Sequence, residues 1–297
     1  MSKGPWYSTC TVNPTWGLPP YKLQSITRPG RVKKIAVIGG GPGGMKAAIV
    51  AAGRGHNVTI FEKSDSLGGL LKISDHSRWR WNFKDFKEYL VHQVDKLGVE
   101  VNLNTDAIPF LIKSAGYDTV LVATGAIPVI PRMKGLDADN IFNIVSAYTN
   151  KKALGKNVVI IGAGKFGTEA GLGMVKDGHN VTVLTSAKEL IEPENHGPHN
   201  LEHQLNIIQY HPNFNYALGV MIKGIDRGKV IYTDSTGSDN AVKADSIVIY
   251  SGLKPMMDEA EKFIGSAEEV LLLGHCTGKN GSLQKTIRSA FFIASQV

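Results

Sequence analysis

The sequence predicts an α/β fold of two Rossmann-like nucleotide-binding domains, with the second domain inserted in the first. Two glycine-rich turns, which begin at Gly39 and Gly162, each follow an apolar strand and open a helix that leads to a second strand. The segments TVLVATGAIP and SIVIYSGLKP resemble one another and fit an outward and a return crossing between domains. The length of 297 residues suits about two domains.

The first 32 residues are rich in Pro, Gly and aromatic residues and show no sustained periodicity. We therefore expect an extended arm over 1–32. Its aromatic residues either anchor a partner protein or fold back on their own domain; they are Trp6, Tyr7, Trp16 and Tyr21.

A nucleotide-binding domain that takes FAD is predicted over 33–129 and 245–297. Short runs of apolar residues predict its strands, and apolar residues at helical spacing predict its helices. The strands are expected over 35–38, 58–61, 99–103 and 119–122, and the helices over about 44–54 and 83–97. The closing EEVLLLGHCTGKNGSLQKTIRSAFFIASQV predicts a last strand and a final helix that rejoin this domain.

A second domain, which takes NAD(P)H, is predicted over 130–244. Three closely spaced prolines in ATGAIPVIPRMKG favour an extended crossing, with a boundary near Ile130. Beyond it we expect strands over 157–161 and 181–184, a helix over about 167–176, and short strands over 215–250 with a turn at 234–239.

The first glycine turn has the chemistry of a dinucleotide site. Gly39 permits the tight turn, Gly41 lets backbone N–H groups approach a phosphate, and Gly44 allows close packing of helix on sheet. Glu62 stands about 20 residues further on, where an acid accepts the ribose hydroxyls. A glycine-rich helix cap is the alternative interpretation. The other residues expected to line this cofactor site are Pro42, Gly43, Lys63, Gly69, Leu70, Thr124 and Gly125.

The second turn repeats the pattern with Gly162, Gly164 and Gly167, but Thr185 replaces the acid at the end of the second strand. A neutral residue there, with Ser186 and Lys188 nearby, favours tolerance of the additional phosphate of NADPH. The turn is either a second nucleotide site or a purely structural unit. Expected cofactor contacts include Lys165 and Phe166. Glu169, inside the helix, either positions the nicotinamide as a catalytic residue or is a favourable charge near a helix N-terminus.

Composition and residue spacing exclude other classes. The net charge of +7 suits anionic cofactors, an acidic partner or simply a solvated surface. No basic stretch is interleaved with aromatic residues, so nucleic-acid binding is not expected. No run approaches about 18 apolar residues and MSKGPWYSTC has no apolar signal core, so no membrane association is expected.

Two cysteines, Cys10 and Cys276, are too few for a disulfide framework and lack the C-x-x-C spacing of a redox pair. A reducing, cytoplasmic location fits this usage. His196, His199 and His203 cluster in a polar segment without further ligands, and no metal site is expected from them.

Six segments together resemble one known group of flavoenzymes. They are STCTVNPTWG, VIGGGPGGMKAA, TIFEKSDSLGGLL, LVATGAIP, VVIIGAGKFGTEA and LLLGHCTGKNGSLQKTIRSAFFIA. The chain resembles the carboxy-terminal half of the 2,4-dienoyl-CoA reductase, enoate reductase and trimethylamine dehydrogenase family. This resemblance implies two glutathione-reductase-like domains that bind FAD and NAD(P)H. In that family a TIM barrel with FMN and a four-cysteine iron-sulfur cluster come first, and neither is encoded here.

The resemblance assigns further residues. Cys10 is similar to the last cluster cysteine, so it is either a relic or a shared ligand of a 4Fe–4S cluster completed by a barrel subunit. Gly274 matches a glycine that the family follows with an acid near the flavin, whereas this chain has His275, which is either a cofactor contact or a packed histidine.

These observations lead to the hypothesis of an NAD(P)H-dependent flavin oxidoreductase subunit that passes electrons through FAD to a partner FMN and iron-sulfur subunit. The alternative is a non-catalytic module that binds ADP or FAD and stabilises a partner. A free-standing reductase acting on a diffusible acceptor is weaker, because no acid, base or dithiol pair for a substrate is evident.

Overall fold

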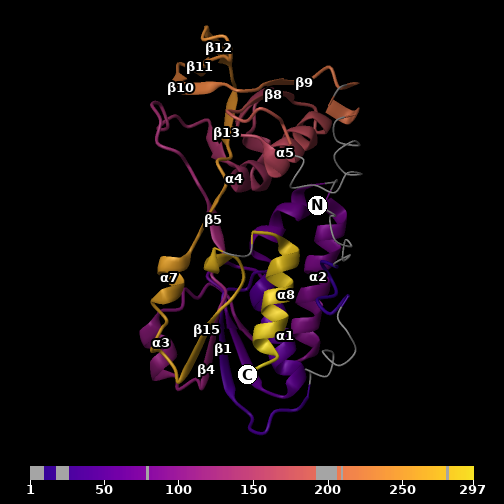
Figure 1. The fold of residues 1–297 in the computed structure, drawn as a ribbon, viewed down its shortest axis with the longest axis vertical. Coiled ribbons are helices and arrows are strands. Elements are labelled where there is room, and N and C mark those ends of the chain that lie inside the picture. The colour runs from indigo at the N-terminus through magenta and orange to yellow at the C-terminus, as the bar shows by residue number, and fades with distance from the viewer. Residues whose placement is uncertain (1–9, 18–26, 78–79, 192–205, 209, 279–280) are drawn as a thin grey trace, which may run out of the picture. The chain divides into compact units, whose positions relative to one another are not determined.

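The computed structural model describes residues 10–17, 27–77, 80–191, 206–208, 210–278 and 281–297. Contacts within the chain divide it into two compact units (Figure 1). Unit 1 comprises the chain up to Asp75 together with Arg80–Ile127 and Lys254–Val297, and unit 2 comprises Pro128–Leu253 with the short segment 76–79. Unit 2 is therefore inserted in unit 1, as the sequence predicts.

Unit 1 is built on a five-stranded sheet in the order β15-β4-β1-β2-β3, in which all neighbouring strands are parallel. The strands are β1 (Lys34–Ile38), β2 (Asn57–Phe61), β3 (Glu100–Asn102), β4 (Thr119–Val122) and β15 (Glu269–Leu272). Because the strands are parallel, their carboxyl ends lie at one edge of the sheet. The chain runs outward from β1 in both directions, which makes the gap between β1 and β4 a topological switch point.

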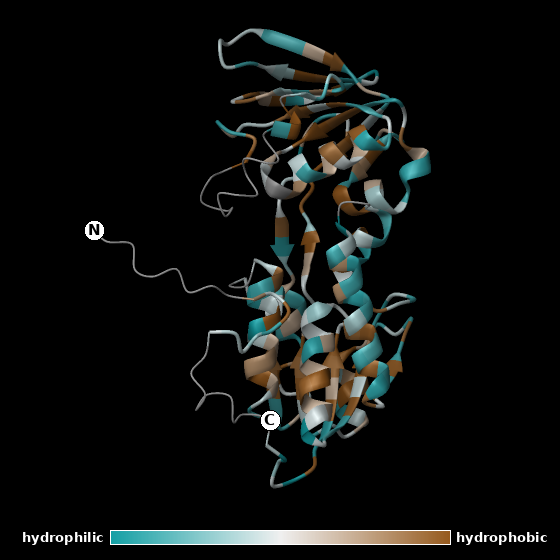
Figure 2. Ribbon diagram, turned by 90° about the vertical axis from the view of Figure 1, so that its right-hand side faces the viewer, coloured by the Kyte–Doolittle hydropathy of each residue, from teal (hydrophilic) through white to brown (hydrophobic). Residues whose placement is uncertain are grey.

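Helices cover both faces of this sheet. Alternate residues of β1 point to opposite faces, so Ile35 and Val37 pack with α1 (Pro42–Arg54), α2 (Trp81–Lys96) and α8 (Leu283–Ala294). Ala36 and Ile38 pack with residues of α3 (Pro109–Ser114) and α7 (Met257–Glu261). The apolar strands between these layers are brown in Figure 2. Two short 3₁₀ helices, η2 (Gly69–His76) and η6 (Gly274–Thr277), follow β2 and β15.

Unit 2 repeats this plan with a parallel sheet in the order β6-β13-β7-β8-β9. Its strands are β6 (Ile141–Asn143), β7 (Asn157–Ile161), β8 (Asn180–Leu184), β9 (Phe214–Ala217) and β13 (Ser246–Ile249). α5 (Gly164–Lys176) packs on β7 and β8, and the smaller helices are α4 (Ile144–Thr149) and η4 (Lys151–Ala153).

The opposite face of that sheet packs against an antiparallel sheet of β10 (Met221–Asp226), β11 (Lys229–Thr233) and β12 (Asp239–Lys243). The two crossings between the units, β5 (Ala126–Pro128) and β14 (Leu253–Pro255), pair with each other in a two-stranded sheet.

The predicted boundaries differ from the structure at one crossing. The sequence places 245–253 in the first domain, whereas β13 lies between β6 and β7 in the sheet of unit 2. The reason is that SIVI is an apolar central strand of the second sheet, and only the residues after it cross back. The helix expected from residue 167 also begins earlier, at Gly164.

We predict that His56 makes folding sensitive to acid. Its Nδ1 accepts a hydrogen bond from the backbone N–H of Lys33 (3.1 Å) and its Nε2 lies 3.0 Å from the carbonyl oxygen of Val297, so the ring is neutral with its proton on Nε2. Burial lowers the pKa of His56 from its ordinary value of 6.5. The unfolded chain then binds more protons, and stability falls as the pH drops below about 6.5 towards the lowered pKa.

Urea unfolding at pH 7.5 and 5.5 measures this effect. We expect His56→Gln to be less stable than the wild type at pH 7.5 and to lose less stability on acidification, while His92→Gln, an exposed control on α2, follows the wild type. An unchanged pH dependence in His56→Gln would contradict the assignment.

Candidate functional site

The carboxyl edge of the unit 1 sheet gathers the residues that the sequence singles out there. Gly39 to Gly44 follow β1, Glu62 follows β2, Thr124 and Gly125 follow β4, and Gly274 and His275 follow β15. Ligands of open α/β sheets bind at this edge, at the switch point. The edge is therefore the candidate site of unit 1.

Backbone contact explains the glycines of the first turn. A Cβ atom on Gly44 would lie 1.8 Å from the carbonyl oxygen of Gly39, so helix α1 can pack this close to β1 only with glycine. Gly39 itself has φ +104°, and a Cβ there would lie 2.6 Å from the carbonyl oxygen of Ala123. These two positions hold the start of α1 directly above the gap between β1 and β4.

Gly41 has a different role, because its backbone is not crowded. It is the N-cap of α1, has no side chain to cap the helix, and a Cβ there would meet only the Cα of Gly69, at 3.9 Å. The N–H groups of a first helical turn have no partner within the helix and carry partial positive charge. The N–H of Gly68 donates to the carbonyl oxygen of Gly40 (2.9 Å), so two stretches of backbone lie side by side at an edge whose helix start suits an anion.

Glu62 is buried at the carboxyl edge of the sheet, and its carboxylate is hydrogen-bonded to the first glycine turn. Its Oε2 accepts a hydrogen bond from the N–H of Gly40 (2.7 Å), and its Oε1 accepts from the N–H (2.9 Å) and the hydroxyl (2.6 Å) of Ser64. A carboxylate offers about four acceptor positions, which leaves about one for a ribose hydroxyl. Binding both ribose hydroxyls, as the sequence predicts, requires the Ser64 hydroxyl to turn away.

The remaining unit 1 residues differ in exposure. Lys63 is exposed, and Leu70, in η2, is half-buried. Gly125 has φ +75° and its carbonyl oxygen accepts from the N–H of Met256 (3.0 Å), which ties the end of β4 to the return crossing. His275 is half-buried, and burial lowers its pKa, so the ring is neutral at neutral pH. The residues Pro42 and Gly43 form the first positions of α1.

Unit 2 has the same backbone construction at its own switch point, between β7 and β13. A Cβ on Gly162 would lie 1.8 Å from the carbonyl oxygen of Tyr250, and one on Gly167 would lie 2.6 Å from that of Gly162. α5 has no side-chain cap at its N-cap, Ala163. The N–H of Gly164 donates to the carbonyl oxygen of Leu190 (2.9 Å), so an anion here would rely on the amides that follow it.

The predicted side chains of unit 2 are spread along that edge. Thr185 is buried and its hydroxyl accepts from the N–H of Ala187 (3.2 Å), while Lys188 is exposed. Glu169 is half-buried within α5, and Phe166 is partly exposed in its first turn. Lys165 is also in α5, but its side chain lies outside the described part of the structure.

Sequence reasoning missed Gly40, Ser64 and Tyr250. A Cβ on Gly40 would lie 2.4 Å from the Cδ2 methyl group of Leu67 and 3.1 Å from Cβ of Glu62, so a side chain there would displace Leu67. The run of three consecutive glycines at 39–41 is the feature of the sequence that could have indicated a role for Gly40. Tyr250 occupies the place in SIVIYSG that Ala123 has in TVLVATG, and a comparison of these two segments position by position would have found it.

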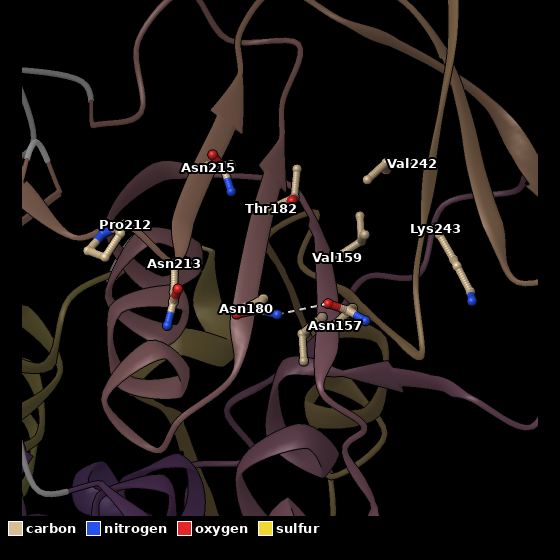
Figure 3. Close-up of a pocket in the computed structure, with 10 residues that line it drawn as sticks. Asn157, Val159, Asn180, Thr182, Pro212, Asn213, Asn215, Val242 and Lys243 are labelled. Atoms are coloured by element: carbon tan, nitrogen blue, oxygen red, sulfur yellow. Dashed lines mark hydrogen bonds between the residues drawn. The ribbon is translucent and has the colours of Figure 1, made fainter.

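Two cavities are lined by residues other than the glycines of the two turns. One, of about 440 Å³, is lined by residues at and near the amino ends of β7, β8 and β9 and, on one side, by Val242 and Lys243 of β12 (Figure 3). The side-chain N–H of Asn180 donates to Oδ1 of Asn157 (3.0 Å) in its wall. The other, of about 740 Å³, lies between α2, β3 and the loop after Glu62. The nucleotide assignment therefore rests on backbone geometry and not on cavity volume.

The arm and the metal predictions have separate outcomes. The N–H of Asn13 donates to Sγ of Cys10 (3.3 Å), and Trp16 is 54% exposed. Trp6, Tyr7 and Tyr21 lie outside the described residues, as do His196, His199 and His203.

Within the described ranges, His, Cys, Asp and Glu form no group of three that could hold a metal ion. The helices of those ranges include none long and apolar enough to cross a membrane.

Comparisons with known proteins identify the family and the fold of the chain. The family model described as pyridine nucleotide-disulphide oxidoreductase matches residues 33–269. The chain is 30% identical over 294 residues to an NADH oxidase of Thermoanaerobacter brockii, covering 97% of this chain and 44% of that protein. A solved structure of 2-naphthoyl-CoA reductase with 2-naphthoyl-CoA is 31% identical with a TM-score of 0.89, covering 97% of this chain and 43% of that one.

The chain thus spans less than half the length of these relatives. The thioredoxin reductase of Lactococcus lactis, at 16% identity and a TM-score of 0.69, shares the fold over 89% of this chain and 97% of its own. The predicted two-domain Rossmann-like fold and the family resemblance are both confirmed.

Substitution of Gly41 separates nucleotide binding from folding. The protein has room for a Cβ at Gly41, but that atom would project into the open edge where a diphosphate would lie. We expect Gly41→Ala to lower the free energy of unfolding by no more than about 1 kcal/mol and to weaken flavin-nucleotide binding at least about tenfold. Flavin content after purification, titration with FAD and urea unfolding measure the two effects.

Gly53→Ala is the matched control, because nothing lies within 4 Å of a Cβ at this other glycine of α1. It should keep full nucleotide binding and gain about 0.5–1 kcal/mol of stability. Wild-type FAD affinity in Gly41→Ala would place the diphosphate elsewhere.

Proposed function

The chain belongs to the pyridine nucleotide-disulphide oxidoreductase family, and on this basis we propose that it is the FAD- and NAD(P)H-binding part of a flavin oxidoreductase that passes electrons from NAD(P)H to a partner. The observation that carries the proposal is the repeated turn. In both units a glycine at the start of the helix lies against the carbonyl oxygen of the first glycine, at the switch point of a parallel sheet.

In this proposal unit 1 binds FAD. The first-turn amides of α1 bind the diphosphate beside Gly41 and Gly69, and Glu62 accepts a ribose hydroxyl. Thr124, Gly125, Gly274 and His275 line the path of the remaining half along the same edge. Bound FAD supplies hydride acceptance and onward release of the electrons, and the protein supplies binding and orientation.

Unit 2 then binds NAD(P)H, with the diphosphate at the start of α5. Gly162, Gly164 and Gly167 shape the turn, Thr185 and Lys188 lie near the adenosine ribose, and Glu169 orients the nicotinamide. The absence of an acid at Thr185 favours acceptance of NADPH. Lys188 is exposed and so is available to an added phosphate.

The electrons must leave by a route other than a dithiol in this chain. Its two cysteines are Cys10 and Cys276, and Cys276 is fully buried with its Sγ donating to the carbonyl oxygen of Leu273 (3.1 Å). We therefore propose a partner with FMN in a TIM barrel and an iron-sulfur cluster. The relatives support a larger assembly, since each is more than twice the length that this chain covers.

Cys10 is the proposed contribution of this chain to that cluster. An N–H that donates to sulfur, as Asn13 does to Cys10, stabilises a thiolate ligand. In the complex with a barrel subunit that carries three cysteines, Cys10→Ser should lose cluster iron and the cluster absorption, while FAD content stays unchanged.

Cys276→Ser is the control for Cys10→Ser. Because Cys276 is buried in unit 1, its substitution should leave the cluster intact. A full cluster in the Cys10→Ser complex would show that Cys10 is not a ligand.

A non-catalytic module that binds ADP or FAD is the second candidate. Two observations favour it: His275 stands where the family has an acid, and the amide of Gly164 is already bonded to Leu190. This module would bind flavin or adenine nucleotide without reacting with NAD(P)H.

The absorption spectrum of the purified protein distinguishes the two candidates. We expect visible flavin bands that bleach on anaerobic addition of NADPH or NADH, and slower bleaching in Glu169→Gln with retained flavin. Flavin that neither reduced nucleotide bleaches would favour the non-catalytic module, and a protein that binds no flavin would contradict both.

A further inference from the structure

The two glycine turns share one backbone design but differ in side chains at two matched positions. The carbonyl oxygen of Ala123 lies against Gly39 in unit 1, and that of Tyr250 lies against Gly162 in unit 2. Counting from the first glycine of each turn, Gly43 corresponds to Phe166. Unit 1 therefore has Gly43 and Ala123 where unit 2 has two aromatic residues.

These aromatic residues contact each other. The ring centroids of Phe166 and Tyr250 are 5.9 Å apart with an interplanar angle of 48°. A Cβ on Gly167 would lie 3.5 Å from Cδ1 of Tyr250, so the tyrosine ring lies against the first turn of α5. Phe166 is 37% exposed. The pair thus covers the β13 side of the switch point and presents aromatic surface there.

The direction of a bound dinucleotide follows from the sheet order. β8 and β13 lie on opposite sides of β7. The adenosine ribose of a βαβ site lies at the end of the second strand, which is β8 with Thr185. A dinucleotide whose diphosphate lies at the start of α5 must extend its other half towards β13, where Tyr250 stands.

We propose that Phe166 and Tyr250 form the wall against which the nicotinamide-ribose half of NAD(P)H packs, and that this wall positions the nicotinamide. The inference rests on the proposed function of unit 2. At the matched positions of unit 1, Gly43 and Ala123, no aromatic pair can form, and a Cβ on Gly43 would lie 3.0 Å from Cγ2 of Thr286. The aromatic pair thereby makes the two glycine turns chemically different, even though their backbones are alike.

Two ligands test the inference directly. NADPH carries the nicotinamide-ribose half, whereas 2′-phospho-ADP-ribose keeps the adenosine and diphosphate but has no nicotinamide. For Phe166→Ala we expect the affinity for NADPH to fall about tenfold or more, because stacking on an aromatic ring is lost, and the affinity for 2′-phospho-ADP-ribose to stay within about twofold. Tyr250→Ala should behave alike and Tyr250→Phe, which keeps the ring, should bind as the wild type.

Tyr216→Ala, which removes a half-exposed ring from the edge strand β9, is the control and should change neither affinity. If Phe166→Ala and Tyr250→Ala lowered the affinities for both ligands equally, the substitutions would have damaged the whole binding site of unit 2. This result would overturn the inference. Wild-type affinity for NADPH in both variants would also overturn it while leaving the proposed function intact. A wild-type protein that binds neither ligand would instead contradict the proposed function.

Discussion

The architecture of both units depends on one short backbone contact, the approach of a helix start to the end of a strand. In unit 1 the contact joins Gly44 to the carbonyl oxygen of Gly39, and in unit 2 it joins Gly167 to that of Gly162. A side chain at Gly44 or Gly167 would push the helix away from the sheet. The contact brings the backbone of the first helical turn to the switch point, where the partial positive charge of a helix start favours a phosphate.

The two units use this contact under different conditions. In unit 1 a buried carboxylate, Glu62, bonds to the turn through Gly40, and the second stretch of backbone at Gly69 completes an edge with little side-chain obstruction. In unit 2 the N–H of Gly164 donates a hydrogen bond to the carbonyl oxygen of Leu190, and the rings of Phe166 and Tyr250 lie on the β13 side of the turn. Similar strands and turns therefore have unequal chemistry in the two units, which suits the proposed binding of two different nucleotides.

The composition of the chain limits how the proposed electron path continues. A thiol that is fully buried, like that of Cys276, cannot exchange with a disulfide substrate, and Cys10 has no second cysteine beside it. Membership in a family that is described by disulphide chemistry thus does not by itself give this chain a redox-active pair of cysteines. The length of the relatives agrees with this view, because each has a further region that this chain does not match.

The sequence by itself determined the local units. Apolar strands such as 34–38 and 157–161, the glycines that follow them and the closing strands specify βαβ units, because the period of apolar residues and the steric demands of the turns are local properties. Only the tertiary structure decided which strands become neighbours. β13 joins the second sheet through pairing with β6 and β7, so residues 245–253 could not be assigned from their own pattern. The contacts of Glu62 with Gly40 and of Phe166 with Tyr250 likewise join residues distant in sequence, and their geometry follows from packing.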